Sequence, residues 1–243
     1  MLKIDFHTHS ADDPCDEIPY STTDLIDRAA QLGFDALAVT LHDKQLALDT
    51  LIPYAADRGI VLIRGIERTI EGKHVLLLNF RRGAEDVRSF HDLFRLKERE
   101  PGIVIAPHPF FPHSSCLRRL MHRHADLIDA VEYNGMFTKA VNFNREAERW
   151  ARQHQKPMVG NGDVHRLCQL GTTYSRVDAE RDADAICAAV AKGRVRVEAQ
   201  PHSALTAGRL MADLMVTDVL ARRRRKTGQS DRSIVGMGLP ASS

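Results

Sequence analysis

The sequence has no long hydrophobic run and no secretory pattern at its start. Its 243 residues contain no stretch of about 18 consecutive apolar residues, the length that a membrane-spanning helix needs. The first residues also lack the basic segment followed by an apolar segment that marks a signal peptide. We therefore expect a cytoplasmic protein with no membrane partner.

Cysteines are few and widely spaced. The four of them form no C-x-x-C pair, and they are Cys15, Cys116, Cys168 and Cys187. This spacing is not that of a structural zinc site or a redox motif. Disulfides are uncommon in a reducing cytoplasm, so we expect four free thiols.

An excess of charge of one sign is also missing. The chain has 34 Lys and Arg against 32 Asp and Glu, for a formal net charge of +2. This balance gives no reason to expect a nucleic-acid or membrane surface as a partner. No repeat or internal boundary is visible. We expect one domain over residues 1–225 and a flexible tail over residues 226–243, which are rich in Gly, Ser and Pro.

Histidine, by contrast, is frequent, and two of the 12 histidines lie near the start. The apolar segment 2–6 is a candidate strand that leads directly into His7 and His9. Residues two apart on an extended backbone point to the same side, and neutral imidazole is a ligand for zinc and iron. The pair is a candidate metal site, although two surface histidines would give the same pattern.

The rest of the chain alternates between strand and helix patterns. The predicted strands cover residues 35–40, 60–66, 102–106, 129–133 and 157–161, and the predicted helices cover 21–32, 44–57, 84–99, 140–154 and 183–192. Most of these strands lead into a His, Asp or Glu residue. Parallel α/β folds place their chemistry at the carboxyl ends of the strands, so these side chains should share one edge.

Residues 67–80 have the pattern of a hairpin with a two-residue turn at Glu71-Gly72. That turn would pair Ile70 with Lys73 and Thr69 with His74. Cross-strand partners share a face, so His74 would lie on the same face as Glu67. The alternative is an ordinary hairpin histidine, because register predictions slip easily.

Seven side chains follow the ends of predicted strands: His7, His9, His42, Glu67, His108, Asp163 and His165. Burying these side chains without partners would cost free energy. Gathered at one rim, however, they can bind two or three divalent metals. Two metals bridged by Glu67 would lower the pKa of a shared water and hold the attacking and leaving oxygens of a phosphate ester.

In this arrangement the sequence resembles the polymerase and histidinol phosphatase (PHP) family over about residues 1–198. The motifs that carry the resemblance are Asp5-Phe-His-Thr-His-Ser10, Val39-Thr-Leu-His-Asp43, Gly65-Ile-Glu67, His74-Val-Leu-Leu-Leu78, Ala106-Pro-His-Pro109, Val131-Glu-Tyr-Asn-Gly135 and Gly162-Asp-Val-His165. They occur in the family's order. The resemblance implies an α/β fold, a distorted (β/α)7 barrel related to the TIM barrel, with its metal site at the carboxyl ends of the strands.

The resemblance also implies three metal sites that share ligands and hold zinc, manganese or iron. The first would use His7, His9, Glu67 and Asp163; the second Glu67, His74 and His108; and the third His42, His165 and a residue of the first loop. Asp12, Asp13, Asp16 and Glu17 are all candidates for that residue, and we favour Asp16 for its spacing. The family usually has Asp where this chain has Leu41, so the third site could be weaker and a two-metal enzyme is the alternative.

By this resemblance the chain is a phosphoesterase that hydrolyses a small phosphomonoester or phosphodiester through a metal-bridging hydroxide, with Glu67, Asp163 and His165 as catalytic residues. Candidate phosphate contacts are Arg68, His113, Lys139 and Arg166, although a surface charge is the more common role for each of them. The substrate is expected to be a small phosphate ester, with a nucleotide or oligonucleotide as an option. Two alternatives are a metal hydrolase of carbon–nitrogen or carboxyl-ester bonds and a non-catalytic metal-binding module.

Overall fold

The computed structural model describes residues 1–212, and the predicted tail at 226–243 lies outside this range. The strands are β1 (Leu2–Thr8), β2 (Ala36–Val39), β3 (Val61–Ile70), β4 (Lys73–Leu78), β5 (Ile103–Ala106), β6 (Ala130–Asn134), β7 (Met158–Asn161), β8 (Thr173–Val177) and β9 (Val195–Ala199). The helices are α1 (Thr22–Gln31), α2 (Leu51–Ala56), α3 (Phe90–Arg99), α4 (Leu120–Arg123), α5 (Asn144–Gln153) and α6 (Ala183–Ala191), with a 3-10 turn at Ala125–Leu127.

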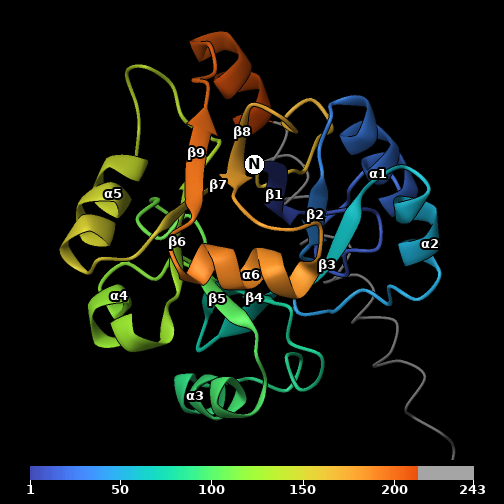
Figure 1. Ribbon diagram of the computed structural model, residues 1–243. Coiled ribbons are helices and arrows are strands. Elements are labelled where there is room, and N and C mark those ends of the chain that lie inside the picture. The colour runs from blue at the N-terminus through green and yellow to red at the C-terminus, as the bar shows by residue number, and fades with distance from the viewer. Residues whose placement is uncertain (213–243) are drawn as a thin grey trace, which may run out of the picture.

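Nine of the described strands form one curved sheet in the order β7-β6-β5-β4-β3-β2-β1-β8-β9. Strands β1 to β3 are mutually parallel, as are β5 to β7, whereas β4 runs antiparallel to both of its neighbours. The helices α1 to α5 lie outside this sheet (Figure 1). The result is a mixed α/β barrel, so the expected fold class is confirmed.

Two sets of hydrogen bonds join β7 to strands from the other half of the sheet. The Gly160 amide donates to the Ser175 hydroxyl at 3.0 Å, which joins β7 to β8. Just beyond β7, the Val164 amide donates to the His7 carbonyl, and the His9 amide donates to the Val164 carbonyl, both at 3.2 Å. A Cβ at Gly160 would lie 2.5 Å from the Tyr174 carbonyl oxygen, so this close approach requires glycine. The barrel is therefore nearly closed.

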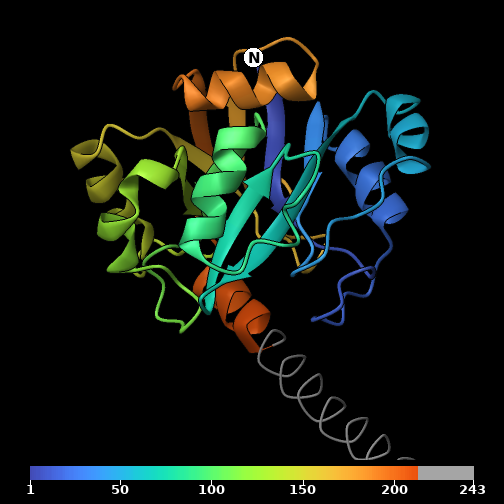
Figure 2. The same cartoon turned by 90° about the horizontal axis from the view of Figure 1, so that it is seen from below.

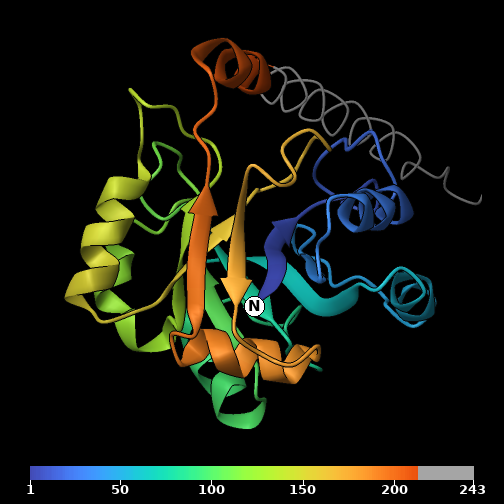
Figure 3. The ribbon, with the colours of Figure 1, turned by 45° about the horizontal axis from the view of Figure 1, so that its top comes forward.

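Strand β8 was not expected from the sequence. It pairs antiparallel with β1 on one side and with β9 on the other, and Figure 3 shows the three strands side by side. Its sequence, Thr-Tyr-Ser-Arg-Val, follows a glycine-containing turn and is too short and polar to stand out as a strand. This antiparallel pair is an addition to the distorted (β/α)7 barrel expected from the sequence.

The helix α6 covers the barrel end at which the amino-terminus lies (Figure 2). Its buried residues Ile186 and Val190 pack in one cluster with interior residues of the strands, such as Ile4, Leu76 and Ile105. This apolar plug fills that half of the barrel. The other half is left for polar side chains, at the end where the parallel strands finish.

The hairpin of β3 and β4 has the predicted register. Thr69 pairs with His74, and Ile70 pairs with Lys73. However, β3 does not end before Glu67; it continues to Ile70 and carries Glu67 in its middle. Because β4 runs in the opposite direction, its first residues lie at the same edge as the carboxyl ends of the parallel strands. His74 is thereby brought to that edge.

A register irregularity in β1 lies between Asp5 and Thr8. Ile4 and Phe6 pack in the apolar plug, yet the Nε2 atom of His7 lies 3.2 Å from Glu67 at the same edge. In a regular strand Phe6 and His7 would face opposite sides. Bulges re-aim side chains in this way, and here the irregularity lets the strand fill the interior first and then supply imidazoles.

Within residues 1–212, no helix has both the length and the apolar character needed to cross a membrane. All four cysteines lie within this range, and no disulfide joins any of them.

Candidate metal centre

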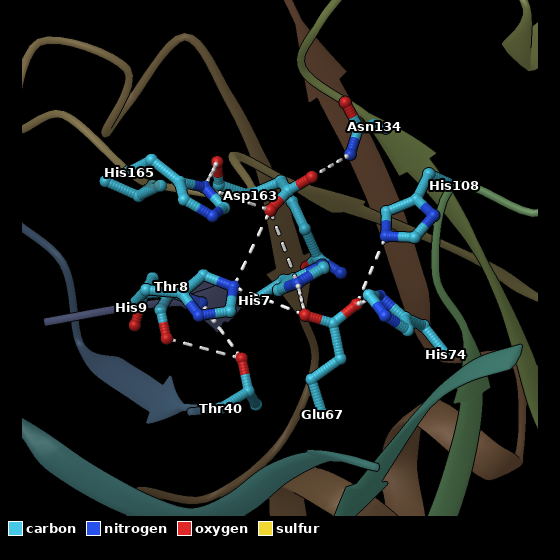
Figure 4. A network of polar contacts seen from close by, with 12 residues as sticks. His7, Thr8, His9, Thr40, Glu67, His74, His108, Asn134, Asp163 and His165 are labelled. Carbon is cyan, nitrogen blue, oxygen red and sulfur yellow. Dashed lines mark hydrogen bonds and ion pairs between the residues drawn. The ribbon is translucent and has the colours of Figure 1, made fainter. Parts of the chain in front are cut away.

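Imidazoles and carboxylates from segments far apart in the sequence meet at the open end of the barrel, and Figure 4 shows most of them. The expected residues brought together there are His7, His9, Asp16, His42, Glu67, His74, His108, Asp163 and His165. Five groups of three such side chains place one ligand atom each within 4.8 Å of the others. The sequence therefore supplied the members of the cluster, and the structure supplies their geometry.

Glu67 is at the centre of the cluster and is 1% exposed. Its Oε1 atom lies 2.7 Å from His74 Nδ1 and 3.2 Å from His108 Nε2. Its Oε2 atom faces two further imidazoles, with His7 Nε2 at 3.2 Å and His42 Nε2 at 3.1 Å. Burial by itself raises the pKa of a carboxyl group, but these imidazoles hold the pKa of Glu67 well below its usual value. Glu67 is thus an ionised carboxylate with each oxygen directed at a different set of nitrogens.

His9 shows that the cluster suits metal ions. Its Nδ1 atom lies 3.0 Å from Asp13 Oδ2. Its Nε2 atom is buried, and among the described residues it has no hydrogen-bond partner, although Glu67 Oε2 and Asp163 Oδ1 lie 3.4 and 3.7 Å away. A buried polar atom without a partner is costly. A divalent ion between these three atoms would remove that cost, and imidazole and carboxylate donors suit zinc, manganese and iron.

Asp163 is placed by an unusual backbone. Its φ is 50°, in the left-handed region, and it follows Gly162, where a Cβ would come within 2.6 Å of the Val164 side chain. The Gly162 amide donates to the Asp5 carboxylate at 3.0 Å. Burial raises the pKa of Asp5 to about 8. These contacts turn the chain so that Asp163 Oδ1 lies 3.4 Å from His7 Nε2 and also 3.4 Å from His165 Nδ1.

The first loop contributes two carboxylates rather than one. Asp16 Oδ2 lies 3.0 Å from His165 Nε2 and 3.8 Å from His42 Nδ1. Asp13 Oδ2 accepts from the His42 amide at 2.9 Å and lies 3.0 Å from the Nδ1 atoms of both His9 and His42. These imidazoles lower the pKa of Asp13 and Asp16 despite burial, which raises it. Asp13 was an open candidate in the sequence, and the structure gives it the larger share of contacts.

The pKa values of several imidazoles in the cluster shift in the opposite direction, upward. Burial alone would lower the pKa of His42, but the carboxylates of Glu67, Asp13 and Asp16 raise it to about 9. Similar neighbours raise the pKa of His7, His108 and His165 against the effect of burial. Without metal, the cluster holds protons where the ions would bind, so metal binding must release them.

A second layer of side chains was missed in the sequence. His7 Nδ1 lies 2.8 Å from Glu132 Oε2, and Glu132 also accepts from the side chains of Asn134 and Asn161 at 2.7 and 3.0 Å. Asn134 in turn donates to Asp163 Oδ2 at 3.1 Å. Glu132 is 0% exposed and follows the buried apolar residues Ala130 and Val131 of β6. A glutamate inside a buried strand was the available signal, because burial of an unpaired carboxylate is costly.

Leu41, which precedes His42, lies in the hydrophobic core rather than in the cluster. Leu41 is fully buried among apolar side chains that include Leu25 and Ile26, so it does not replace the carboxylate that the family usually has there. Asp13 contacts His42 instead.

On the other side of the cluster, His108 Nδ1 lies 3.5 Å from the buried thiol of Cys116.

The four expected phosphate contacts occupy different environments. The Arg68 guanidinium is buried, donating to the Val87 carbonyl at 2.6 Å and to Asp43 at 2.7 Å. His113 lies 2.7 Å from the Ser115 hydroxyl, and Lys139 is exposed. Arg166 is half-buried and donates to the carbonyl of His165 at 2.9 Å. Of the four, Arg166 has a contact that joins it directly to a residue of the cluster.

Comparison with known proteins gives the same fold. The PHP-associated family model matches residues 141–195. A two-domain Bacteroides vulgatus protein containing a predicted PHP-like metal-dependent phosphoesterase aligns with a TM-score of 0.66 and 21% identity, over 82% of this chain and 65% of that one. PsfC from Pseudomonas syringae aligns with a TM-score of 0.60 and 17% identity, over 91% and 98%.

The lesion-specific endonuclease EndoQ from Pyrococcus furiosus aligns with a TM-score of 0.56 and 16% identity, over 81% of this chain and 57% of that one. This chain thus spans less than two thirds of the length of the Bacteroides and Pyrococcus proteins. No curated protein matches its sequence. At these identities the likeness shows the fold, a PHP-like barrel.

Proposed function

We propose that this chain, a PHP-family protein by its fold and by its match to the PHP-associated model, is a metal-dependent phosphoesterase that hydrolyses a small phosphomonoester or phosphodiester. The observation that carries the proposal is the environment of Glu67. Its two oxygens face four imidazole nitrogens within 3.2 Å, and the unpartnered Nε2 of His9 lies beside one of them.

Three sets of residues would hold the metals, and the first two sets share Glu67. His7, His9, Glu67 and Asp163 form the first; Glu67, His74 and His108 form the second; and His42, His165, Asp13 and Asp16 form the third. Bound zinc, manganese or iron would supply Lewis-acid activation of water and stabilise charge on phosphate oxygens. Because Glu67 belongs to two sets, its two oxygens would fix the spacing between two ions.

The chain's own residues hold these ligands in position. Glu132 accepts from the Nδ1 atom of His7, which leaves Nε2, 3.2 Å from Glu67, as the nitrogen that would bind a metal after losing its proton. A ring nitrogen held in this way fixes the tautomer and the orientation of the imidazole. Asn134 holds the outer oxygen of Asp163 and leaves Oδ1 facing His7.

Proton transfer is assigned to Asp163 and His165, two partly exposed members of the cluster. Their side chains are 23% and 13% exposed, whereas those of His7 and His9 are 0% exposed. His165 Nδ1 lies 3.4 Å from Asp163 Oδ1 and its Nε2 lies 3.0 Å from Asp16. Protons can therefore leave the buried centre through this pair. Arg166, held to the His165 carbonyl, is proposed to contact the phosphate.

The test combines metal content with a substrate panel. Elemental analysis should find two or three ions per chain, and the manganese-supplemented protein should release 4-nitrophenol from its phosphate monoester or bis-ester. Matched 4-nitrophenyl acetate and 4-nitroanilide substrates should react far more slowly. Faster ester or anilide turnover would favour a hydrolase of carboxyl-ester or carbon–nitrogen bonds. Fewer than two ions and no turnover would favour a non-catalytic metal-binding module.

A further inference from the structure

Two phenylalanine rings lie beside the metal cluster, at the end of the barrel where it meets solvent. The Phe111 ring centroid is 6.4 Å from that of His108, in an edge-to-face arrangement, and 5.3 Å from that of Phe143. Phe143 is 39% exposed, and its neighbour Val141 is 53% exposed. We name Phe111 and Phe143 the aromatic pair. They come from different loops, after β5 and after β6, and meet next to a proposed metal ligand.

The backbone on both sides of the pair is fixed. Arg118 closes the first loop, because its amide donates to the Pro109 carbonyl at 2.8 Å and its Nε donates to the Phe111 carbonyl at 3.3 Å. In the second loop, Asn144 is 1% exposed and exchanges hydrogen bonds with the backbone of Asn134 at 2.9 Å. The adjacent Phe143 is thereby tied to the residue that also holds Asp163. These rings are presented by a rigid frame rather than by loose loops.

Local propensity does not explain Phe143. It occupies the N-cap of α5, where Ser, Thr, Asp or Asn would satisfy the first amides of the helix. The Asn142 side chain supplies the cap instead, because its Oδ1 atom accepts from the amide of Asn144, the first residue of the helix, at 3.0 Å. Phe143 is therefore not needed for capping, and a large apolar residue that is 39% exposed beside a polar cluster runs against the usual burial of phenylalanine. Such departures are expected where a site is built.

We infer that the aromatic pair stacks on a flat ring carried by the substrate, so that the preferred phosphate esters are nucleotide-like or aryl rather than alkyl. The inference rests on the proposed phosphoesterase function and adds its substrate class. Because Phe111 lies beside His108, an ester bound at the metal set that includes His108 would have the aromatic pair next to it. The face of an aromatic ring accepts any nucleobase or aryl group by stacking, without a hydrogen-bond code.

The first measurement is binding by calorimetry to the metal-loaded protein, with thymidine 5′-monophosphate and 2-deoxyribose 5-phosphate as probes. The two share one phosphate ester linkage and differ only in the base. Thymidine 5′-monophosphate should bind about tenfold more tightly, the effect of one stacked base. Equal binding of the two probes would overturn the inference. Phenyl phosphate and cyclohexyl phosphate form a second pair that separates aryl from nucleobase recognition.

The variants F111L and F143L keep an apolar side chain and remove the flat ring. Each should reduce the preference for thymidine 5′-monophosphate and leave binding of the sugar phosphate unchanged. The control F94L removes another exposed ring, 48% exposed on α3, and should keep the preference. Loss of binding of both probes, or a change in oligomeric state with the preference intact, would refute a substrate-stacking role.

Hydrolysis is scored separately with 4-nitrophenyl phosphate. If no phosphate ester is hydrolysed under any metal, the proposed function fails, whereas the binding preference still reports on the aromatic pair. If hydrolysis occurs without any preference for a ring, the proposed function stands and the stacking inference fails.

Discussion

Replacing Glu67 by glutamine is the sharpest test of the proposed centre. Glutamine keeps the shape of the side chain but replaces one oxygen with an amide group that neither accepts a hydrogen bond nor binds a metal. In the structure both oxygens of Glu67 are engaged, at 2.7 and 3.2 Å from His74 and His108 and at 3.2 and 3.1 Å from His7 and His42. E67Q must therefore lose one of the two sets of contacts.

The expected loss follows from burial. Removing one preorganised contact from a water-excluded active site costs about 3–4 kcal/mol of transition-state stabilisation, and 4 kcal/mol corresponds to roughly a thousandfold in rate. We expect kcat/KM for the aryl phosphate to fall by about a thousandfold or more, and at least one ion per chain to be lost. In the metal-free protein, E67Q should lower the free energy of unfolding by less than about 4 kcal/mol, because imidazoles left without Glu67 can release their protons.

The assay measures steady-state hydrolysis and metal content on the same preparations. E98Q is the matched control, since Glu98 is exposed on α3 and the substitution is chemically identical. It should retain activity and metal. Near-normal turnover of E67Q with a full complement of ions would refute a centre in which Glu67 joins two metals.

Three further outcomes are expected. In the metal-free protein, carboxylates that outweigh burial raise the pKa of His42 to about 9. The protonated His42 then adds about 3 kcal/mol to the free energy of unfolding. This contribution is fully present below about pH 6.5 and is lost as the pH rises through about 9. Urea unfolding of the chelated protein at pH 6 and pH 9 should show this loss, and an alkaline gain in stability would contradict it. C116A removes the thiol 3.5 Å from His108 Nδ1 and should weaken one bound metal about tenfold in a chelator competition, with unchanged affinity as the opposing result. G160A places a Cβ 2.5 Å from a carbonyl oxygen, whereas a Cβ at Gly208 meets no atom within 4 Å. G160A should therefore lower the free energy of unfolding by about 1–3 kcal/mol, and the control G208A should not.

The sequence alone determined the local features of this protein. The turn at Glu71-Gly72 set the hairpin register, because a two-residue loop leaves one pairing for the strands beside it, and Thr69 does pair with His74. Apolar segments of four to six residues marked most of the strands. The polar residues that follow them marked the edge of the barrel, since carboxyl ends of parallel strands gather there.

Tertiary structure decided which of these residues meet and what holds them. Asp13 and Asp16 lie three residues apart, and their shares of the contacts depend on where His9, His42 and His165 come to lie. Glu132 is a single carboxylate between Val131 and Tyr133 in the sequence, and only the fold brings it to His7. No local pattern carries contacts between residues 125 positions apart, as His7 and Glu132 are.

The same reason applies to β8 and to the aromatic pair. The short, polar β8 is a strand because β1 and β9 supply its hydrogen bonds, and β-propensity depends strongly on such partners. Phe111 and Phe143 are ordinary apolar residues in the sequence, and they become a surface beside His108 because two loops are closed onto one end of the barrel. Side-chain type and spacing are local properties, whereas the meeting of distant loops is set by the packing of the whole chain.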